Sequence, residues 1–289
     1  MSFDFFIGVD GGGTGTRLLL ADRDGQILSH ATGGPSGLGL GVSAAWRAIS
    51  HCAEQAFAHL GQTFNPTHCA IGLGLAGVHN ASWAQAFLAE APSFPAIRLD
   101  NDGFTTLLGA HAGQPGVIVA VGTGSVGEAW FGGDNKRTVS GWGFPVGDEG
   151  SGAWIGLRAA QLAQKALDGR AMRGPLADAV ITHFGGSVDP AFIWLSQANQ
   201  TTYAQLATLV LAYGQQDAAA ATILALAGEE IAAIAHALDP DETLPFALCG
   251  GLAEALRPWL PTALVNRARQ PLGDSATGAL YLIRKHING

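Results

Sequence analysis

The sequence predicts an α/β fold of two lobes, each with a mixed sheet and flanking helices. Strand-like apolar runs alternate with helix-like stretches along the chain. In addition, an arrangement of strand, glycine turn and strand occurs twice, about 110 residues apart, at residues 5–21 and 117–131. We therefore expect a duplicated core with one copy in each lobe, residues 1–113 and 114–289. The terminal helix, residues 275–287, is expected to pack on the first lobe.

Composition excludes several classes of protein. The chain has 289 residues, of which 48% are hydrophobic and only 13% charged, and its net charge is −8. A protein that binds nucleic acid or an anionic membrane surface needs a basic face, so neither partner is expected. No signal peptide and no membrane span are expected. The three cysteines are far apart and predict no disulfide framework, which favours a cytoplasmic protein.

The first strand of the chain, residues 5–9, ends at an acid and three glycines. Two further strand-like runs follow, at residues 18–21 and 26–31, so the segment predicts a meander. A dinucleotide-binding fold or a P-loop would instead continue from the glycine turn into a helix.

The residue types of this turn suit a phosphate and a metal ion. Gly11, Gly12 and Gly13 have no side chain to keep a ligand away, and their N–H groups can point at one anion. Thr14 adds a hydroxyl group, and the carboxylate of Asp10 could hold Mg²⁺ directly or through water. The alternative interpretation is a plain hairpin with a flexible tip.

Further elements of the first half follow from local patterns. Apolar residues at helical spacing predict helices, and short apolar runs bounded by glycine or acids predict strands. We expect helices at residues 43–60, 82–91 and 104–112, and strands at residues 69–76 and 96–99.

The second half begins with the repeated hairpin and then becomes mostly helical. Residues 190–238 are expected to be largely helical, because alanine and leucine recur there without strand-like alternation. We expect strands at residues 126–131, 137–140 and 246–249, and helices at residues 153–167, 218–238, 252–256 and 275–286.

The second glycine turn matches the pattern G-x-G-x-x-G. A Rossmann fold would need a helix to begin there, but the following residues, Val-Gly-Glu-Ala-Trp-Phe, are a poor helix start. A second phosphate-binding hairpin is preferred, formed by Gly122 and Gly124 with the hydroxyl groups of Thr123 and Ser125 as donors. The chain contains no Gly-Lys-Ser/Thr sequence, which excludes a P-loop.

Acids at two places in the chain are candidates for catalysis or sugar binding. Asp102 follows a predicted strand and could accept the proton of a hydroxyl group that attacks phosphorus; a helix N-cap or turn is the alternative, and Asp100 is a weaker rival. Asp148 and Glu149 lie in a glycine-rich loop and could hold sugar hydroxyls, or could be solvated loop acids. Trp142 in the same loop is either a platform for a sugar ring or a core residue.

The glycine pair at Gly250 and Gly251 lies between a predicted strand and a helix. Such a pair lets a base and ribose lie against the backbone, and the alternative is a tight strand-to-helix turn. The nine histidines form no helical pair, so no zinc site is expected.

Taken together, these motifs resemble the sugar kinase, heat-shock chaperone and actin superfamily, and more narrowly the BadF/BadG/BcrA/BcrD ATPase family with its N-acetylglucosamine and glucosamine kinases. The resemblance covers essentially the whole chain. Residues 10–14 and 122–125 match the two phosphate motifs of the family, and residues 250–251 match its adenosine motif. Residues 101–102 match the segment that carries the catalytic base. Residues 141–151 match a segment that is typical of the amino-sugar kinases.

This resemblance implies a two-lobe actin-like ATPase (ribonuclease H-like) fold and an ATP- and Mg²⁺-dependent kinase that acts on the 6-hydroxyl of glucosamine or N-acetylglucosamine. It implies Asp102 as the base, and Asn101, Thr123, Trp142, Asp148 and Glu149 around the sugar. Where these kinases commonly carry an Asn that contacts the sugar, this chain has Gly37.

The resemblance leaves other readings open. A homodimer is compatible with the sequence. The alternative functions are an ATPase that activates an iron–sulfur dehydratase, which needs suitably placed cysteines, and a nucleotide-binding regulator without turnover.

Overall fold

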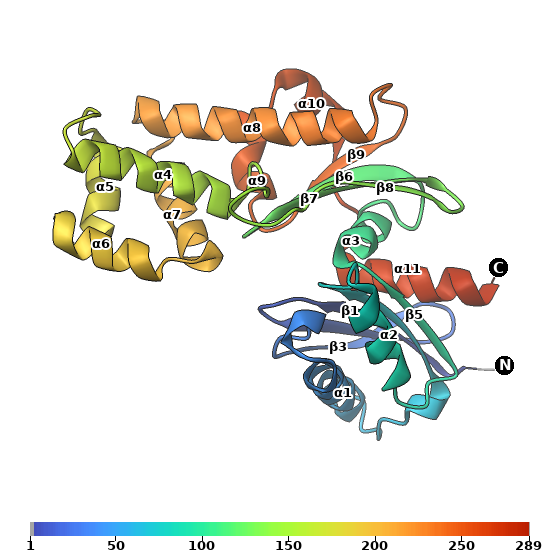
Figure 1. Cartoon of the computed structure of the whole chain (residues 1–289). Helices are drawn as coiled ribbons and strands as arrows, with labels where there is room; N and C mark the ends of the chain where they lie inside the picture. The colour runs from blue at the N-terminus through green and yellow to red at the C-terminus, as the bar shows by residue number, and fades with distance from the viewer. Residues whose placement is uncertain (1–2, 289) are drawn as a thin grey trace. The chain divides into compact units, whose positions relative to one another are not determined.

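The computed structural model describes residues 3–288 and divides the chain into two compact units, each with its own five-stranded sheet (Figure 1). Unit 1 comprises Met1–Gly116, Trp130–Asn135 and Gln270–Gly289. Unit 2 comprises Val117–Ala129 and Lys136–Arg269. The segment at residues 130–135 and the C-terminal segment therefore join unit 1, although the rest of the second half forms unit 2.

The sheet of unit 1 is mixed and has the strand order β3-β2-β1-β4-β5. The first three strands are antiparallel neighbours, whereas β1, β4 and β5 are parallel. The strands are β1 (Phe5–Gly11), β2 (Thr16–Ala21), β3 (Ile27–Gly33), β4 (Cys69–Leu75) and β5 (Ala96–Asp100).

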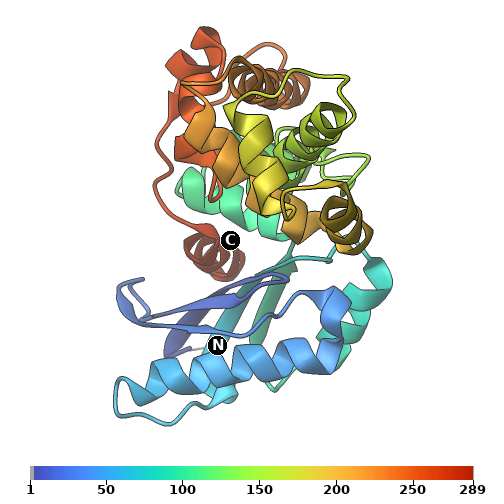
Figure 2. The same cartoon turned by 90° about the vertical axis from the view of Figure 1, so that its left-hand side faces the viewer.

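Helices cover both faces of this sheet. Figure 2 shows α1 (Val42–Ala58) along one face and α11 (Ser275–Asn288) along the other. On the α1 side, the buried core contains Ile7, Val9 and Ile49 together with the aromatic rings of Trp46 and Phe87, which stack with 4.2 Å between centroids. The remaining helical elements are η1 (Leu38–Leu40), η2 (Pro66–His68), α2 (Ala81–Ala89) and α3 (Asp102–Ala110).

Helix α11 lies directly on the backbone of three neighbouring elements, because a glycine occupies each of these contacts. A Cβ atom at Gly8 of β1 or Gly72 of β4 would overlap carbonyl oxygens of α11, those of Ala276 and Ala279. A Cβ atom on Gly278 of α11 would overlap the Thr105 carbonyl oxygen of α3. Sheet, α3 and α11 therefore form one closely packed block.

The sheet of unit 2 repeats this topology. Its order is β10-β9-β6-β7-β8. As in unit 1, three strands that are consecutive in the chain lie side by side, here β6, β7 and β8. The next strand, β9, then pairs with the first of them, β6, and β10 pairs with β9. The pairs β6–β9 and β9–β10 are parallel, as β1–β4 and β4–β5 are in unit 1. The strands are β6 (Gly116–Val121), β7 (Ser125–Gly132), β8 (Asn135–Ser140), β9 (Phe246–Cys249) and β10 (Ala268–Arg269). The prediction of a duplicated core is confirmed by this shared order.

A helical layer packs on the second sheet and supplies most of the core of unit 2. The core joins Val119 and Phe246 of the strands to apolar residues of α4, α7 and α8, including Ile155, Leu206 and Leu224. The helices are α4 (Gly152–Leu167), α5 (Pro175–His183), α6 (Val188–Gln197), α7 (Gln200–Tyr213), α8 (Ala218–Leu238), α9 (Ala253–Leu256), η3 (Arg257–Trp259) and α10 (Thr262–Arg267).

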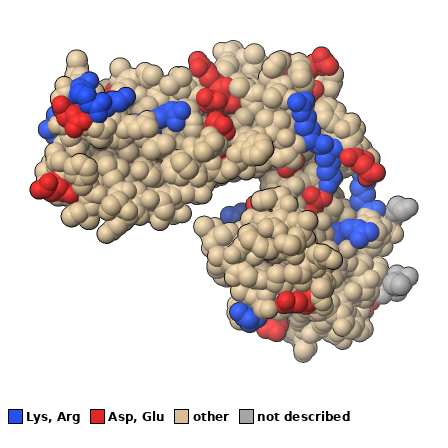
Figure 3. Space-filling view, in the orientation of Figure 1, with Lys and Arg blue, Asp and Glu red and all other residues tan. Residues whose placement is uncertain are grey.

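Helix α8 is the one helix within residues 3–288 that is long and apolar enough, by length and composition alone, to cross a membrane. Its side chains Leu224 and Ile231 are fully buried in the core of unit 2. A core helix passes the same test, so this feature is weak support for a membrane span. On the face shown in Figure 3, Lys and Arg gather in a few places with Asp or Glu nearby, and most of the surface carries no charge.

The α/β class with mixed sheets is confirmed, and so are the strands expected from apolar runs. The helical stretch expected at residues 190–238 is divided into α6, α7 and α8, because Asn199 and Asp217 begin new helices as N-caps. The elements α5, α10 and β10 were not anticipated, and α9 has only 4 residues.

The close packing of α11 on α3 yields a stability prediction. Gly278→Ala places a methyl group against the Thr105 carbonyl and 2.6 Å from the Gly109 nitrogen, so we expect a loss of roughly 1–3 kcal/mol in the free energy of unfolding. Gly34→Ala is the matched control, because a Cβ atom at Gly34 meets nothing within 4 Å. Urea titration measures both variants, and equal midpoints for Gly278→Ala and the wild type would contradict the packing argument.

Candidate functional site

Two carboxylates of unit 1 lie at the carboxyl-terminal edge of its parallel strands. Asp10 is near the end of β1 and pairs in register with Gly74 of β4, which in turn pairs with Asp100 of β5. The chain then passes through Asn101, whose side-chain oxygen accepts a hydrogen bond from the Phe104 N–H (2.7 Å) and caps α3. Asp102 is thereby held at the first position of α3, at the same edge as Asp10.

The environment of these acids raises the pKa of both carboxyl groups. Burial raises the pKa of Asp10, and the nearby charges of Asp102 and Asp274 raise it further, against a hydrogen bond from Ser275 and the charge of Arg17. Burial likewise raises the pKa of Asp102, against hydrogen bonds from the backbone and the charge of His79. A carboxylate with a raised pKa is a better proton acceptor, and a cation would relieve the repulsion around Asp10.

The donor set suits Mg²⁺ better than a metal that needs a protein cage. Within residues 3–288 no group of three or more His, Cys, Asp or Glu side chains is arranged to hold a metal ion. Mg²⁺ usually takes one or two carboxylates and completes its shell with water and substrate phosphates. Asp10, in the negative field of Asp102 and Asp274, fits that pattern.

The glycines of the first turn differ in why they are needed. A Cβ atom at Gly11 would overlap the buried Ser36 hydroxyl, so packing alone requires glycine there. At Gly12 and Gly13 a Cβ atom would meet nothing within 4 Å, and neither residue has a left-handed backbone. Thr14 beside them is exposed. Neither packing nor backbone geometry explains Gly12 and Gly13, whereas close approach of a ligand to the backbone would.

The second glycine turn is attached to the start of α4. Its carbonyl groups at Gly122 and Thr123 accept hydrogen bonds from the N–H groups of Gly152 (2.9 Å) and Ala153 (3.1 Å). A Cβ atom at Gly122 would meet nothing within 4 Å, as at Gly12. The Ser125 hydroxyl donates to the Glu149 carbonyl (2.7 Å), so its proton is already used within the protein.

Asp148 connects this turn to two other segments. Its side chain is only 5% exposed and accepts hydrogen bonds from the backbone of Ser125, Gly143 and Phe144. Burial raises its pKa, and these hydrogen bonds oppose the rise. A Cβ atom at Gly124 would lie 2.7 Å from Asp148 Oδ2, so the carboxylate itself requires glycine in the turn.

Gln200 is a residue of this cluster that the sequence did not indicate. Its side-chain nitrogen Nε2 donates to Asp148 Oδ2 (2.7 Å) from the first position of α7. With three backbone donors and Gln200, the carboxylate has a full set of protein partners. The two residues are 52 positions apart, and the local capping box of α7 at Asn199 gives no indication of this contact.

The other predicted sugar residues are placed differently. Glu149 Oε2 accepts a hydrogen bond from the Ser140 hydroxyl (2.7 Å), which orients the carboxylate within unit 2. Trp142 is 85% exposed and is not a core residue. Its indole is free to cover a ligand from the loop at residues 141–150.

In the glycine pair after β9, packing requires glycine at the first position but not at the second. Gly250 has φ +94°, and a Cβ atom there would overlap the backbone of Val121 at the end of β6. Gly251 faces open space. The Leu252 N–H donates to the Val121 carbonyl (3.1 Å), so this turn lies beside the strand that leads into the second glycine turn.

The structure thus brings the predicted residues together in two groups. Asp10, Asp102 and the first glycine turn belong to unit 1, and the second turn, Asp148, Glu149 and the Gly250–Gly251 turn belong to unit 2. Ser275 and Asp274 join the first group from a segment about 260 residues later in the chain, and no local pattern indicated them.

The cysteines do not form a cluster site. Cys52, Cys69 and Cys249 are all free and buried, in α1, β4 and β9. Burial raises the pKa of the Cys69 and Cys249 thiols to about 12, which opposes the thiolate form that binds iron or zinc.

Comparison with known proteins places these groups in a family. The chain is 32% identical over 286 residues to the glucosamine kinase GspK of Vibrio cholerae, covering 98% of this chain and 96% of that one. A solved structure from Chromobacterium violaceum, provisionally named an N-acetylglucosamine kinase, is 51% identical with a TM-score of 0.94, covering 98% of this chain and all of the other.

More distant structures share the fold. A glucokinase of the ROK family from Streptomyces griseus, solved with glucose and AMPPNP, aligns with a TM-score of 0.54 at 20% identity, covering 97% of this chain and 99% of the other. The family model for BadF/BadG/BcrA/BcrD ATPases matches residues 7–281, so the chain belongs to the BadF/BadG/BcrA/BcrD ATPase family.

Proposed function

We propose that this protein is an ATP-dependent kinase that phosphorylates the 6-hydroxyl of an amino sugar, glucosamine or N-acetylglucosamine. The observation that carries the proposal is the end-to-end match to a glucosamine kinase in a chain whose Asp10 and Asp102 adjoin the same sheet edge. ATP as the phosphoryl donor is supported by the ATPase family and by the AMPPNP complex of a structural neighbour. A cytoplasmic location agrees with the three free cysteines.

In unit 1, we assign Asp102 as the base and Asp10 as the residue that would hold Mg²⁺. Asp102 would accept the proton of the 6-hydroxyl while the sugar oxygen forms its bond to the γ-phosphorus and the bond to the β-phosphate oxygen breaks. Mg²⁺ would supply positive charge next to the phosphates. Gly12, Gly13 and Thr14 would contact the phosphates, since their backbone faces open space or is exposed.

In unit 2, we assign the turn at residues 122–125 to the phosphates and Gly250 and Gly251 to the adenosine. The unexplained glycines at positions 122 and 251 support these roles, because a ligand can lie against a backbone without Cβ atoms. Ser125 would contribute its backbone rather than its hydroxyl proton, which is bonded to Glu149.

The sugar would be held by Asn101, Thr123, Trp142, Asp148 and Glu149. The four protein donors around Asp148, Gln200 among them, support a fixed orientation for its carboxylate, so a sugar hydroxyl would share an oxygen with these donors. Exposed Trp142 could cover the ring and exclude water, which otherwise competes as phosphoryl acceptor.

Removal of the base tests the central assignment. Asp102→Asn keeps the shape of the side chain but cannot accept the proton, so we expect kcat to fall roughly 10²-fold or more while ATP still binds. Amino-sugar-dependent ADP release measures turnover, and calorimetry measures ATP binding. Asp100→Asn is the matched control, two residues earlier in the chain. If Asp100→Asn lost turnover and Asp102→Asn kept it, the assignment of the base would be wrong.

Removal of the metal ligand tests Asp10. Asp10→Asn takes away the negative charge that would hold Mg²⁺, so we expect roughly tenfold more Mg²⁺ for half-maximal rate. A magnesium titration of ADP release at fixed ATP measures the shift. Asp241→Asn, in an exposed turn of unit 2, controls for a change in net charge. An Asp10→Asn titration that overlays the wild-type curve would remove Asp10 from the metal site.

Gln200 tests the orientation of Asp148. Gln200→Ala removes one hydrogen bond to a buried carboxylate, about 1 kcal/mol, so we expect a roughly fivefold higher KM for the amino sugar. The KM for ATP should change less. Gln205→Ala, at an exposed position of the same helix, is the control. A sugar KM equal to that of wild type would show that Gln200 does not position the sugar site.

A further inference from the structure

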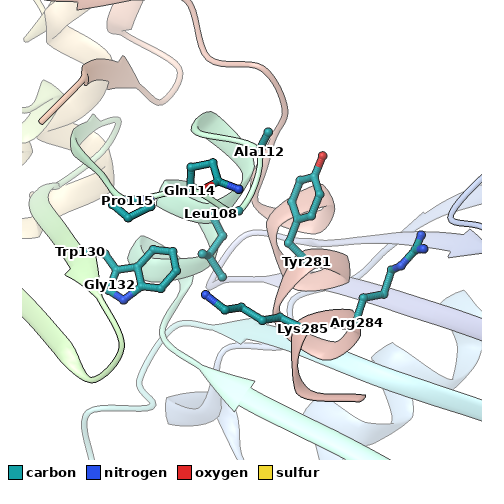
Figure 4. Close-up of a pocket in the computed structure, with 10 residues that line it drawn as sticks. Leu108, Ala112, Gln114, Pro115, Trp130, Gly132, Tyr281, Arg284 and Lys285 are labelled. Atoms are coloured by element: carbon teal, nitrogen blue, oxygen red, sulfur yellow. The ribbon is translucent and has the colours of Figure 1, made fainter. Parts of the chain in front are cut away.

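A cavity of about 430 Å³ lies in unit 1, and none of the residues assigned above to the kinase reaction lines it (Figure 4). Its walls come from the end of α3 and the following turn, from the segment at residues 130–132, and from α11. The lining residues are Leu108, Ala112, Gly113, Gln114, Pro115, Trp130, Gly132, Tyr281, Arg284 and Lys285. Its volume is in the range of small-molecule sites.

Aromatic surface and one cation characterise this cavity. The Trp130 indole is fixed by a hydrogen bond from its N–H to the Gly133 carbonyl (2.9 Å). Figure 4 shows the Tyr281 ring on the other side, and Tyr281 is 37% exposed. Lys285 extends towards Trp130, with Nζ 4.0 Å from the ring centroid.

Lys285 is the cation that remains for a ligand. The Arg284 guanidinium points away from the cavity in Figure 4 and donates to the carbonyl oxygens of Arg23 (3.3 Å) and Asp24 (3.1 Å). Lys285 contacts the Trp130 ring and makes no ion pair with a carboxylate in the described part of the chain. An exposed ammonium beside the Trp130 ring, in a cavity that the Tyr281 ring also lines, suits an anion that carries a ring.

Both helices that line the cavity also reach the catalytic carboxylates. Helix α3 begins at Asp102, and Leu108 in its last turn and Ala112 just after the helix line the cavity. Helix α11 begins at Ser275, which hydrogen-bonds to Asp10 and to Thr105 (2.8 Å), and it carries Tyr281 and Lys285. The two helices touch backbone to backbone at Gly278, so a shift of one moves the other.

The cavity wall also contains strained backbone. Ala112 has φ +49°, a left-handed conformation that is costly for a residue other than glycine, and Gly113 follows with φ +73°. A Cβ atom at Gly113 would lie 3.4 Å from the Tyr281 ring, so this turn packs on the ring that a ligand would contact. The turn that follows α3 therefore contacts the ring that a ligand in this cavity would touch.

We propose that this cavity is a second ligand site, which binds a small ring-bearing anion of the sugar-phosphate class and acts on Asp102 through α3 and α11. The ring of the ligand packs between Trp130 and Tyr281, and its phosphate pairs with Lys285. Binding there is independent of the proposed kinase reaction. The sugar phosphate that the reaction forms belongs to the same class, so the site would provide feedback by product.

Direct binding tests the site without turnover. We would titrate the full chain, with AMPPNP and amino sugar saturating, with glucosamine 6-phosphate in a calorimeter. Inorganic phosphate serves as an anion without a ring, and further glucosamine as a ring without an anion. Of the three ligands, we expect only glucosamine 6-phosphate to bind. Its affinity should be at least tenfold lower for Lys285→Gln than for the wild type, and unchanged for the exposed control Lys165→Gln. Equal affinity of Lys285→Gln and wild type would overturn the site, and equal binding of inorganic phosphate would overturn the ligand class.

The coupling to Asp102 has its own readout. At saturating sugar and ATP, we expect glucosamine 6-phosphate to lower the kcat of the wild type and of Lys165→Gln. In Lys285→Gln, the ratio of kcat with this ligand to kcat without it should return to one. Binding to the cavity without any change in this ratio would overturn the coupling. If the wild type bound the ligand through Lys285 yet phosphorylated no amino sugar, the proposed kinase function would fail and the site would stand.

Discussion

The arrangement of the acids in unit 1 depends on the direct contact of α11 with the backbone of β1, β4 and α3. Side chains at Gly8, Gly72 or Gly278 would push this helix away. Because the helix lies so close, Ser275 reaches both Asp10 and Thr105, and Asp274 adds its charge to the field at Asp10. The last helix of the chain thus completes a site whose other parts lie within the first 110 residues, and its far end closes a separate cavity.

The glycines near the candidate sites fall into two groups with different physical causes. Gly11, Gly124 and Gly250 are required by neighbours, because a Cβ atom would overlap Ser36, approach Asp148 or overlap Val121. Gly12, Gly13, Gly122 and Gly251 face open space with ordinary backbone angles. Glycine costs conformational entropy on folding, so its use where the fold does not need it is best explained by a ligand against the backbone.

Both units place acids where water is scarce, and they compensate for this in different ways. In unit 2 Asp148 is surrounded by hydrogen-bond donors, so its charge is satisfied by the protein itself. In unit 1 Asp10 lies near Asp102 and Asp274, with one hydrogen bond and the charge of Arg17 as compensation. The first arrangement suits a carboxylate that must keep a fixed orientation towards a neutral ligand, and the second suits a residue that receives a cation.

The sequence by itself determined the fold class, the strands that flank each glycine turn, the duplicated core and the family, because these depend on local periodicity, turn chemistry and motif order. The roles of the individual site residues remain predictions. Only the tertiary structure showed that Gln200 bonds to Asp148, that Ser275 bonds to Asp10, that Ser125 spends its hydroxyl on Glu149, and that residues 130–135 join unit 1. The physical reason is that these contacts join segments far apart in the chain, and their partners are chosen by the packing of whole helices and sheets, which no local pattern of residues encodes.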